Sequence, residues 1–110
     1  MRWRIEVLRN TSGTEPHPRL LVANRQYYRK HIADGTHIAF VAEEDGVQCG
    51  CGEIRFSNEP PSPDNPTGLC ADITEIYVRE PFRDRDTETL ILNRLIEEAR
   101  SRDCGRIARR

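Results

Sequence analysis

Residues 73–99 read ITEIYVREPFRDRDTETLILNRLIEEA, and this stretch decides the fold. A strand pattern passes through a short turn into an amphipathic helix, whose apolar stripe is Leu92, Leu95, Ile96 and Ala99. An arginine at such a turn is typical of folds that present a helix N-terminus to a phosphate, because unpaired N–H groups and the helix dipole both favour an anion there. This turn, however, also carries carboxylates at positions 84, 86 and 88.

The rest of the chain predicts an α+β fold with the element order β-α-β-β-β-α. Trp3, Ile5 and Val7 alternate with charged residues, which indicates a first strand. Helical spacing indicates a helix over residues 19–34 that ends at a glycine. We then expect strands over residues 36–43 and 47–56 joined by a hairpin turn, a proline-rich surface loop over 57–68, a strand over 69–78 and a helix over 87–102. Residues 105–108 indicate a short final strand in a mostly antiparallel sheet.

The strand over residues 69–78 changes its apolar phase partway. Ala71 and Ile73 are odd-numbered, whereas Ile76 and Val78 are even-numbered. A β-bulge between Ile73 and Ile76 places both pairs on the core face. In the strand before it, glycines at positions 50 and 52 predict a bend or the close approach of another backbone.

Size and charge limit the function classes. With 110 residues, the chain is predicted to form a single domain over residues 1–110. Its 17 Lys and Arg against 18 Asp and Glu give a net charge of -1, so no global field attracts nucleic acid or an anionic membrane. No apolar run approaches the roughly 20 residues that span a bilayer. We therefore expect a soluble cytoplasmic protein.

The cysteines and histidines suggest neither a metal site nor a catalytic triad. The C-x-C pair has no second cysteine pair and no nearby histidine, so its spacing does not suit zinc, and we expect buried, reduced thiols. The histidines share no triad spacing with Ser, Cys or Asp. The residues concerned are Cys49, Cys51, Cys70, Cys104, His17, His31 and His37.

The element order and the run Ile73-x-x-Ile76-Tyr77-Val78, followed five residues later by Arg83, resemble the N-terminal and central part of the GCN5-related N-acetyltransferases, the GNAT family. In that family the strand splays at a bulge so that its backbone bonds the pantetheine arm of acetyl-CoA, and an R/Q-x-x-G-x-G/A loop wraps the pyrophosphate. The resemblance therefore implies a GNAT-like fold. It also implies cofactor-binding positions at Ile76, Val78, Arg83, Asp84, Arg85, Asp86, Thr87 and Glu88.

The same resemblance points to two candidates for acid–base chemistry. Asp72 and Glu75 lie on the strand where some family members place a general base for the attacking amine. Such a role needs a carboxylate raised toward neutrality by burial. A solvated strand carboxylate is the alternative interpretation of either residue.

The cofactor loop departs from the family pattern at three positions. Asp84, Asp86 and Glu88 stand where the family has small residues. At an effective dielectric of about 20, one like-charge pair at roughly 4 Å costs on the order of 4 kcal/mol, which corresponds to roughly a thousandfold in affinity. The same residues suit the start of a helix, where Asp86 is a good N-cap. The sequence therefore predicts that acetyl-CoA does not bind in the family manner.

The resemblance also implies a further strand, helix and hairpin with a tyrosine general acid, so we interpret the chain as a truncated family member. The first hypothesis is an engineered or recombined GNAT scaffold that needs no cofactor, has lost acetyl transfer, and forms a homodimer through an open sheet edge or binds a protein. The second is an active N-acetyltransferase that uses acetyl-CoA, with its site completed by another subunit. The third is an acidic surface that binds a basic protein in a salt-dependent manner.

Overall fold

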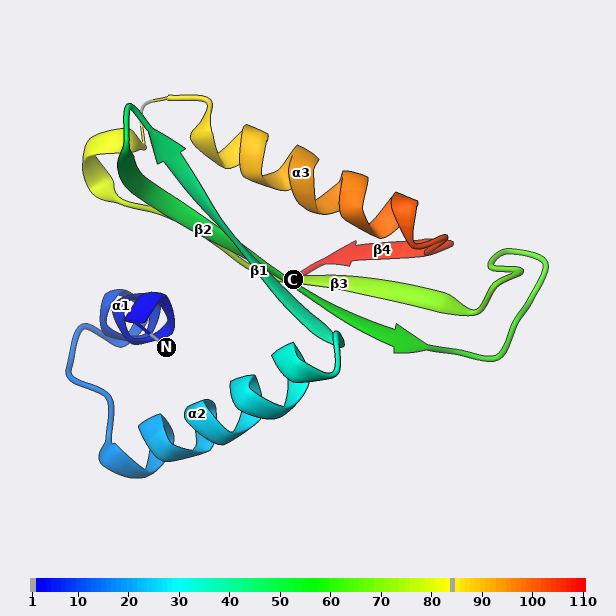
Figure 1. Ribbon diagram of the computed structural model, residues 1–110, viewed down its shortest axis with the longest axis horizontal. Helices are drawn as coiled ribbons and strands as arrows, with labels where there is room; N and C mark the ends of the chain where they lie inside the picture. Colours follow the sequence, from blue (N-terminus) through cyan, green and yellow to red (C-terminus); the bar gives the residue numbers. More distant parts are fainter. Residues whose placement is uncertain (1, 84) are drawn as a thin grey trace. The chain divides into compact units, whose positions relative to one another are not determined.

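The computed structural model describes residues 2–83 and 85–110. The chain divides into two compact units, Met1–Thr36 and His37–Arg110. The first unit contains the helices α1 (Arg2–Ser12) and α2 (Pro18–Ala33). The second contains β1 (His37–Glu44), β2 (Val47–Asn58), β3 (Leu69–Val78), the short 3-10 helix η1 (Glu80–Phe82), α3 (Thr87–Ser101) and β4 (Arg106–Arg109) (Figure 1).

The prediction of an N-terminal strand is wrong, because residues 2–12 form α1. Trp3 and Val7 are four residues apart and Ile5 and Leu8 are three apart, and these spacings bring side chains together on a helix as well. Val7 is buried, and the N–H of Gly13 closes the helix by donating to the carbonyl of Arg9 at 2.8 Å. In such a short segment, periodicity alone does not separate the two structures.

The predicted second element is a helix, as the sequence indicated. Its N-cap is His17, whose Nδ1 accepts from the N–H of Arg19 at 3.1 Å, and a proline follows at the first helical position. Gly35, with φ +77, follows its C-cap. Within this unit, the Nε of Arg4 donates to the Oδ1 of Asn24 at 2.9 Å and so joins α1 to α2.

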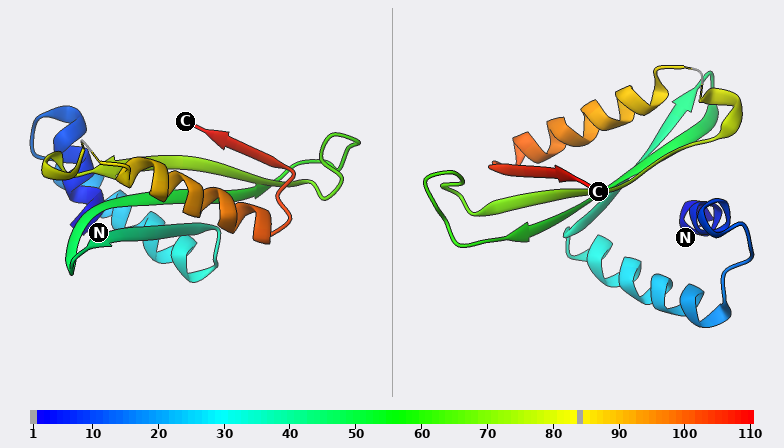
Figure 2. Two further views of the ribbon diagram at one scale, coloured as in Figure 1. Left: turned by 90° about the horizontal axis from the view of Figure 1, so that it is seen from above. Right: turned by 180° about the vertical axis from the view of Figure 1, so that it is seen from behind.

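The second unit is a four-stranded sheet in the order β1-β2-β3-β4, with α3 lying across one of its faces (Figures 1 and 2). The first two pairings are antiparallel and β3 pairs with β4 in parallel. The hairpin turn is confirmed, and its two central residues, Asp45 and Gly46, have the positive φ values that a tight hairpin turn requires. The α+β fold and the short final strand are confirmed as well.

The core lies between α3 and the sheet. Ile54 and Ile73 pack with Leu95 and Ala99, and all four are at most 2% exposed. The glycines of β2 let the helix and the neighbouring strand come close. A Cβ on Gly50 would lie 2.6 Å from the carbonyl oxygen of Tyr77, which confirms the predicted backbone approach.

A Cβ added at Gly52 would meet side chains rather than backbone. A Cβ there would overlap the Cγ2 of Ile91 and lie 3.0 Å from the Cδ1 of Leu95. The small residue at this position therefore sets the distance between α3 and β2.

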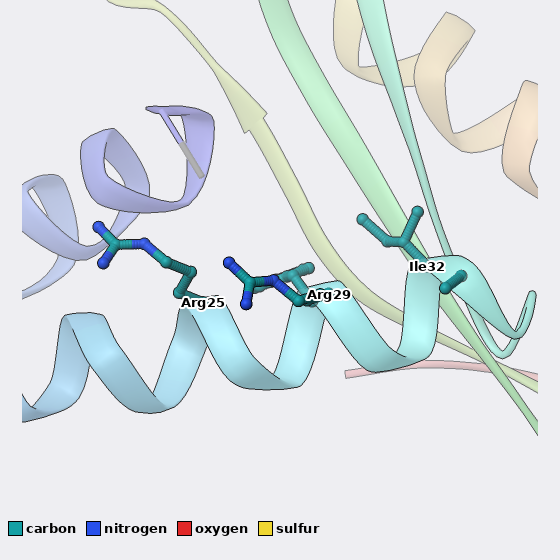
Figure 3. Close-up of a pocket in the computed structure, with 5 residues that line it drawn as sticks. Arg25, Arg29 and Ile32 are labelled. Carbon is teal, nitrogen blue, oxygen red and sulfur yellow. The ribbon is translucent and has the colours of Figure 1, made fainter.

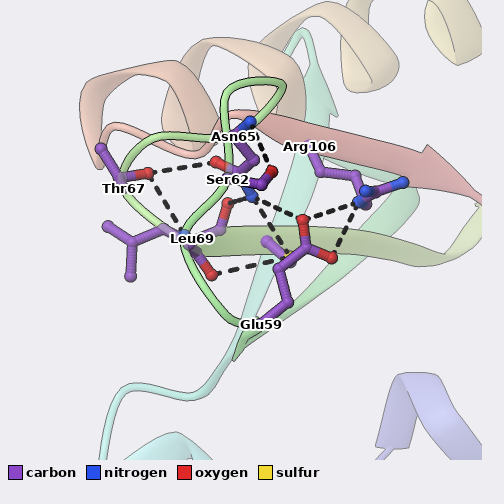
Figure 4. A network of polar contacts seen from close by, with 8 residues as sticks. Glu59, Ser62, Asn65, Thr67, Leu69 and Arg106 are labelled. Atoms are coloured by element: carbon purple, nitrogen blue, oxygen red, sulfur yellow. Dashed lines mark hydrogen bonds and ion pairs between the residues drawn. The ribbon is translucent and has the colours of Figure 1, made fainter.

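The proline-rich loop after β2 is held by Asn65, which is 1% exposed (Figure 4). The Asn65 Nδ2 donates to the Oε1 of Glu59 at 3.0 Å and to the carbonyl of Leu69 at 3.1 Å. Arg106 donates from Nε to both Glu59 oxygens, at 3.1 and 3.2 Å. The network therefore fastens the loop to the start of β4.

All four cysteines are free thiols, as expected. Three are buried and Cys104 is partly buried. Burial raises the pKa of the Cys70 thiol and of the Cys104 thiol. Both groups therefore favour the neutral thiol, which suits a packing role.

Candidate functional site

The predicted β-bulge lies at Thr74. Glu75 pairs with Glu53 and Ile73 with Ile54, so one residue of β3 has no partner in the register. Side chains before and after this point can thus both reach the core. The Oγ1 of Thr74 is buried and has no hydrogen-bond partner among the described residues.

The bulge also marks the place where β3 and β4 part. Their parallel pairing runs from Cys70 to Ile73, and the N–H of Arg110 donates to the carbonyl of Ile73 at 3.0 Å. Within residues 2–83 and 85–110, no strand pairs with the β4 side of residues 75–78. The second half of β3 therefore has an open edge.

Ile76 and Val78 direct their backbone N–H and C=O groups to this open edge. The N–H of Arg79, the residue after β3, donates to the carbonyl of Cys49 at 2.8 Å, so the backbone groups of Arg79 face β2. Backbone groups alternate along an antiparallel strand, so Ile76 and Val78 point the other way. These are the two strand residues named as cofactor-binding positions from the sequence.

The turn after β3 is organised by arginines. The Nε of Arg83 donates to the carbonyl of Val78 at 2.8 Å, and its guanidinium carbon lies 5.9 Å from the centroid of the Tyr77 ring. Arg85 forms an ion pair with Glu44, and this hydrogen bond raises the pKa of Arg85. Asp84, the position between the two arginines, lies outside the described residues.

The N-terminus of α3 differs from the prediction that the Asp86 side chain caps the helix. Asp86 is the N-cap residue, but its side chain makes no capping hydrogen bond. Thr87 is 7% exposed, and the carboxylate of Glu88 pairs with the Nη2 of Arg109 at 2.6 Å. The first-turn N–H groups are therefore not capped by Asp86, and one of the three acidic side chains is neutralised by β4.

The two candidate bases have different surroundings. Asp72 pairs with Arg55 at 2.8 Å and with Arg110 at 3.5 Å. Glu75 lies at the bulge, directly across from Glu53 in the register, and is partly buried. Two guanidinium groups therefore hold Asp72, whereas Glu75 lies opposite another carboxylate.

Sequence reasoning missed the neighbour of Glu75. The Nε2 of His37 lies 2.9 Å from the Oε1 of Glu53, with these residues 3% and 6% exposed. The two residues are 16 positions apart, and only the register of β1 on β2 brings them together. In the sequence, this pair was signalled only by a histidine at the predicted start of a strand.

Metal-binding groups do not gather in the part of the chain that the structure describes. No cluster of three or more His, Cys, Asp or Glu side chains there could hold a metal ion. The other two histidines have local roles: His17 caps α2, and the Nδ1 of His31 lies 2.7 Å from the Oγ1 of Thr36. Among the described helices, none is both long and apolar enough to cross a membrane.

A bulged strand, an open edge and a helix that begins beside it are the geometry that the sequence resemblance implied. The family model described as Acetyltransferase (GNAT) family matches residues 2–109. The chain belongs to the GNAT family. A search of curated proteins gives no match.

Solved structures resemble this GNAT chain closely. A predicted acetyltransferase from Clostridium acetobutylicum, solved with acetyl-CoA, is 26% identical with a TM-score of 0.81, and the match covers 96% of this chain and 68% of that one. A GCN5-related N-acetyltransferase from Ralstonia eutropha JMP134 is 23% identical with a TM-score of 0.77, over 99% and 72%. A Trypanosoma brucei acetyltransferase is 16% identical with a TM-score of 0.70, over 99% and 74%. In a transcriptional regulator from Bacillus halodurans C-125, the match spans 63% of that chain.

Proposed function

We propose that this GNAT chain is an acetyl-CoA-dependent N-acetyltransferase, with the cofactor along the open edge of β3 and at the N-terminus of α3. The observation that carries the proposal is the end of the β3–β4 pairing at Thr74, which leaves Ile76 and Val78 with backbone groups directed to the edge. The similar Clostridium acetobutylicum structure contains acetyl-CoA, which supports the choice of cofactor.

The residues at this edge fit the cofactor chemically. The Oγ1 of Thr74 is a buried polar atom without a partner among the described residues, at the point where the strands separate. The edge would take the amides of the pantetheine arm, because an extended chain with alternating donors and acceptors can add to a strand edge. Among residues 2–83 and 85–110, Arg83 is hydrogen-bonded through its Nε to the carbonyl of Val78, so the other N–H groups of its guanidinium would be available to the phosphates.

When bound, acetyl-CoA supplies an activated thioester for attack by an amine. The protein's own groups then have two tasks. The N–H groups of the first turn of α3 favour negative charge nearby. Glu75, partly buried at the bulge, accepts the proton of the amine as it attacks.

A second function is favoured by one specific observation. Asp86 is exposed and its carboxylate makes no cap hydrogen bond, so its charge remains where the family places a small residue. Arg85, the nearest described cation in sequence, is committed to Glu44. These features support a GNAT scaffold that has lost acetyl-CoA binding and acts through protein association.

Titration calorimetry with acetyl-CoA separates the two functions. The active enzyme predicts binding in the micromolar range, and the combined Asp86→Asn and Glu88→Gln variant is expected to bind about tenfold more tightly, because two like charges are removed. The matched control is Glu97→Gln with Asp103→Asn, which removes the same charge from exposed positions farther along the chain.

One calorimetric result contradicts the proposal of an active enzyme. Absence of binding heat in the wild type, with binding recovered when Asp84, Asp86 and Glu88 are all changed to Gly, identifies the scaffold. If neither protein binds, the cofactor proposal is wrong for the whole edge rather than for the loop alone.

A further inference from the structure

Thr74 carries a buried hydroxyl that the fold leaves without a partner. Its Oγ1 is shielded from solvent and has no hydrogen-bond partner among residues 2–83 and 85–110, while the residue as a whole is partly buried. Most buried side-chain polar atoms in native proteins are hydrogen-bonded, because leaving such a bond unmade is unfavourable. A hydroxyl of this kind indicates a ligand or an ordered water that completes it.

The two neighbouring strands define the position of Thr74. Ile73 and Glu75 both have partners on β2, so Thr74 is the residue that the bulge leaves unpaired. On the other side, the pairing of β3 with β4 ends at Ile73, whose carbonyl accepts the N–H of Arg110 at 3.0 Å. Thr74 therefore lies where the open edge of β3 begins. Its β-branched side chain is restricted at χ1, which limits the places that the hydroxyl can take.

The proposed cofactor site has a direction, and Thr74 lies at one end of it. Arg83, whose Nε donates to the carbonyl of Val78 at 2.8 Å, marks the phosphate end together with the N-terminus of α3. From Val78 back to Thr74 the strand measures about 13 Å. The pantetheine arm has about twelve bonds between its phosphate oxygen and its sulfur, which extend to about 13–14 Å. An arm along this edge therefore brings the thioester to the bulge.

We propose that the hydroxyl of Thr74 donates a hydrogen bond to the carbonyl oxygen of the acyl thioester, so that the edge binds acetyl-CoA more tightly than free CoA; this contact rests on the proposed acetyl-CoA site. Free CoA lacks the carbonyl acceptor, and its thiol is a weak hydrogen-bonding group. Acetyl-CoA therefore satisfies the hydroxyl, whereas the product CoA leaves it unpaired. The contact that holds the substrate thus favours release of the product.

Titration calorimetry of the free protein with acetyl-CoA and with CoA tests the contact through the ratio of the two dissociation constants. Thr74→Val keeps the shape of the side chain and removes the hydroxyl. It is expected to weaken acetyl-CoA binding about tenfold and to change CoA binding by less than about twofold, because only the acyl carbonyl loses a donor. Thr74→Ser retains the hydroxyl and is expected to keep the wild-type ratio. Thr74→Ala, which removes the hydroxyl in a smaller side chain, is expected to show the same loss of preference as the valine variant.

Thermal unfolding without ligand separates this role from a structural one. Valine needs no hydrogen-bond partner, so Thr74→Val is expected to unfold at or above the wild-type temperature. Thr11→Val, the same change at an exposed position, is the matched control and is expected to leave both the unfolding temperature and the ratio unchanged. A Thr74→Val protein that unfolds well below the wild type would show that the hydroxyl is already bonded in the free protein, for instance to an ordered water, and would overturn the proposal.

A basic groove on α2 can attract the phosphates of either ligand and needs its own control. Arg25 and Arg29 are exposed and extend from the helix in the same direction, and they line this groove with Tyr28, Ile32 and Ala33 (Figure 3). Binding there would not distinguish acetyl-CoA from CoA, because both carry the same phosphates. Arg29→Gln is therefore expected to leave the ratio of the two dissociation constants unchanged, and a changed ratio would count against Thr74 as the source of the preference.

The calorimetric results distinguish a failure of this contact from a failure of the proposed function. If the wild type binds acetyl-CoA no more tightly than CoA, or if Thr74→Val weakens both ligands equally or neither, the cofactor site stands and Thr74 is not its acyl contact. If the wild type binds neither ligand, the proposed function and the contact are both wrong.

Discussion

Asn65 shows how one side chain can fix a loop that has no regular structure. Its amide donates to Glu59 and to the Leu69 carbonyl, and its Oδ1 accepts from the Thr67 hydroxyl at 3.3 Å. Thr67 also donates to the carbonyl of Asp103 at 2.7 Å, in the turn before β4. A buried amide with several partners is costly to replace, because each partner is then left without its bond.

We predict that Asn65→Ala lowers the free energy of unfolding by about 2 kcal/mol, since the carbonyl of Leu69 loses one of its two donors and a cavity opens beside Gly105. Urea unfolding followed by circular dichroism measures the change. The neighbouring exposed residue provides the control: Asp64→Ala is expected to change the stability by less than about 0.5 kcal/mol. Equal effects of the two substitutions would contradict the role given to Asn65.

Glu59 makes the stability of this loop depend on pH. Its hydrogen bond from Asn65, and then that from Arg106, lower the pKa of the Glu59 carboxyl. A carboxyl with a lowered pKa in the folded protein stabilises it above its unfolded pKa, and that stability is lost as the pH falls through the folded value. We predict that wild type is more stable than Glu59→Gln at neutral pH and that the difference shrinks in acid. Urea titrations from neutral to acid pH test it, and a constant difference would refute it.

At the scale of elements, the sequence patterns predict most of the second unit correctly and the start of the first unit wrongly. The β1–β2 hairpin, the Thr74 bulge and α3 follow from patterns that are local, namely turn residues, a phase change and a helical stripe. The helix α1 did not follow from a local pattern, because the apolar spacing of residues 3–8 is compatible with both a strand and a helix. The His37–Glu53 pair and the Arg109–Glu88 pair depend on strand register and on the docking of α3, which no local pattern contains.

The distance between α3 and β2 gives a prediction at this scale. Gly52→Ala is expected to destabilise the protein by about 1–3 kcal/mol, because its Cβ would overlap Ile91 and push α3 from the sheet. Thermal unfolding measures it. Ser57→Ala, on an exposed part of the same strand, serves as the control. The double variant Gly52→Ala, Ile91→Ala should cost less than the sum of its single changes, since the overlap is relieved. Strict additivity would show that the overlap is not the cause.

At the scale of the whole molecule, apolar burial is unevenly distributed. The described residues of α2 include none that is buried, and those of α1 include Val7 alone. The second unit holds the continuous core of Ile54, Ile73 and Leu95. Local stability follows the number of buried apolar contacts, so the two units should open with different free energies.

We predict that the amides of α2 exchange with deuterium at least about tenfold faster than those in the centres of β2 and β3 under native conditions, because opening α2 exposes little apolar surface. Hydrogen–deuterium exchange with mass spectrometry of peptides from each element measures the difference. Equal protection of α2 and β2 would mean that the chain unfolds as one cooperative unit.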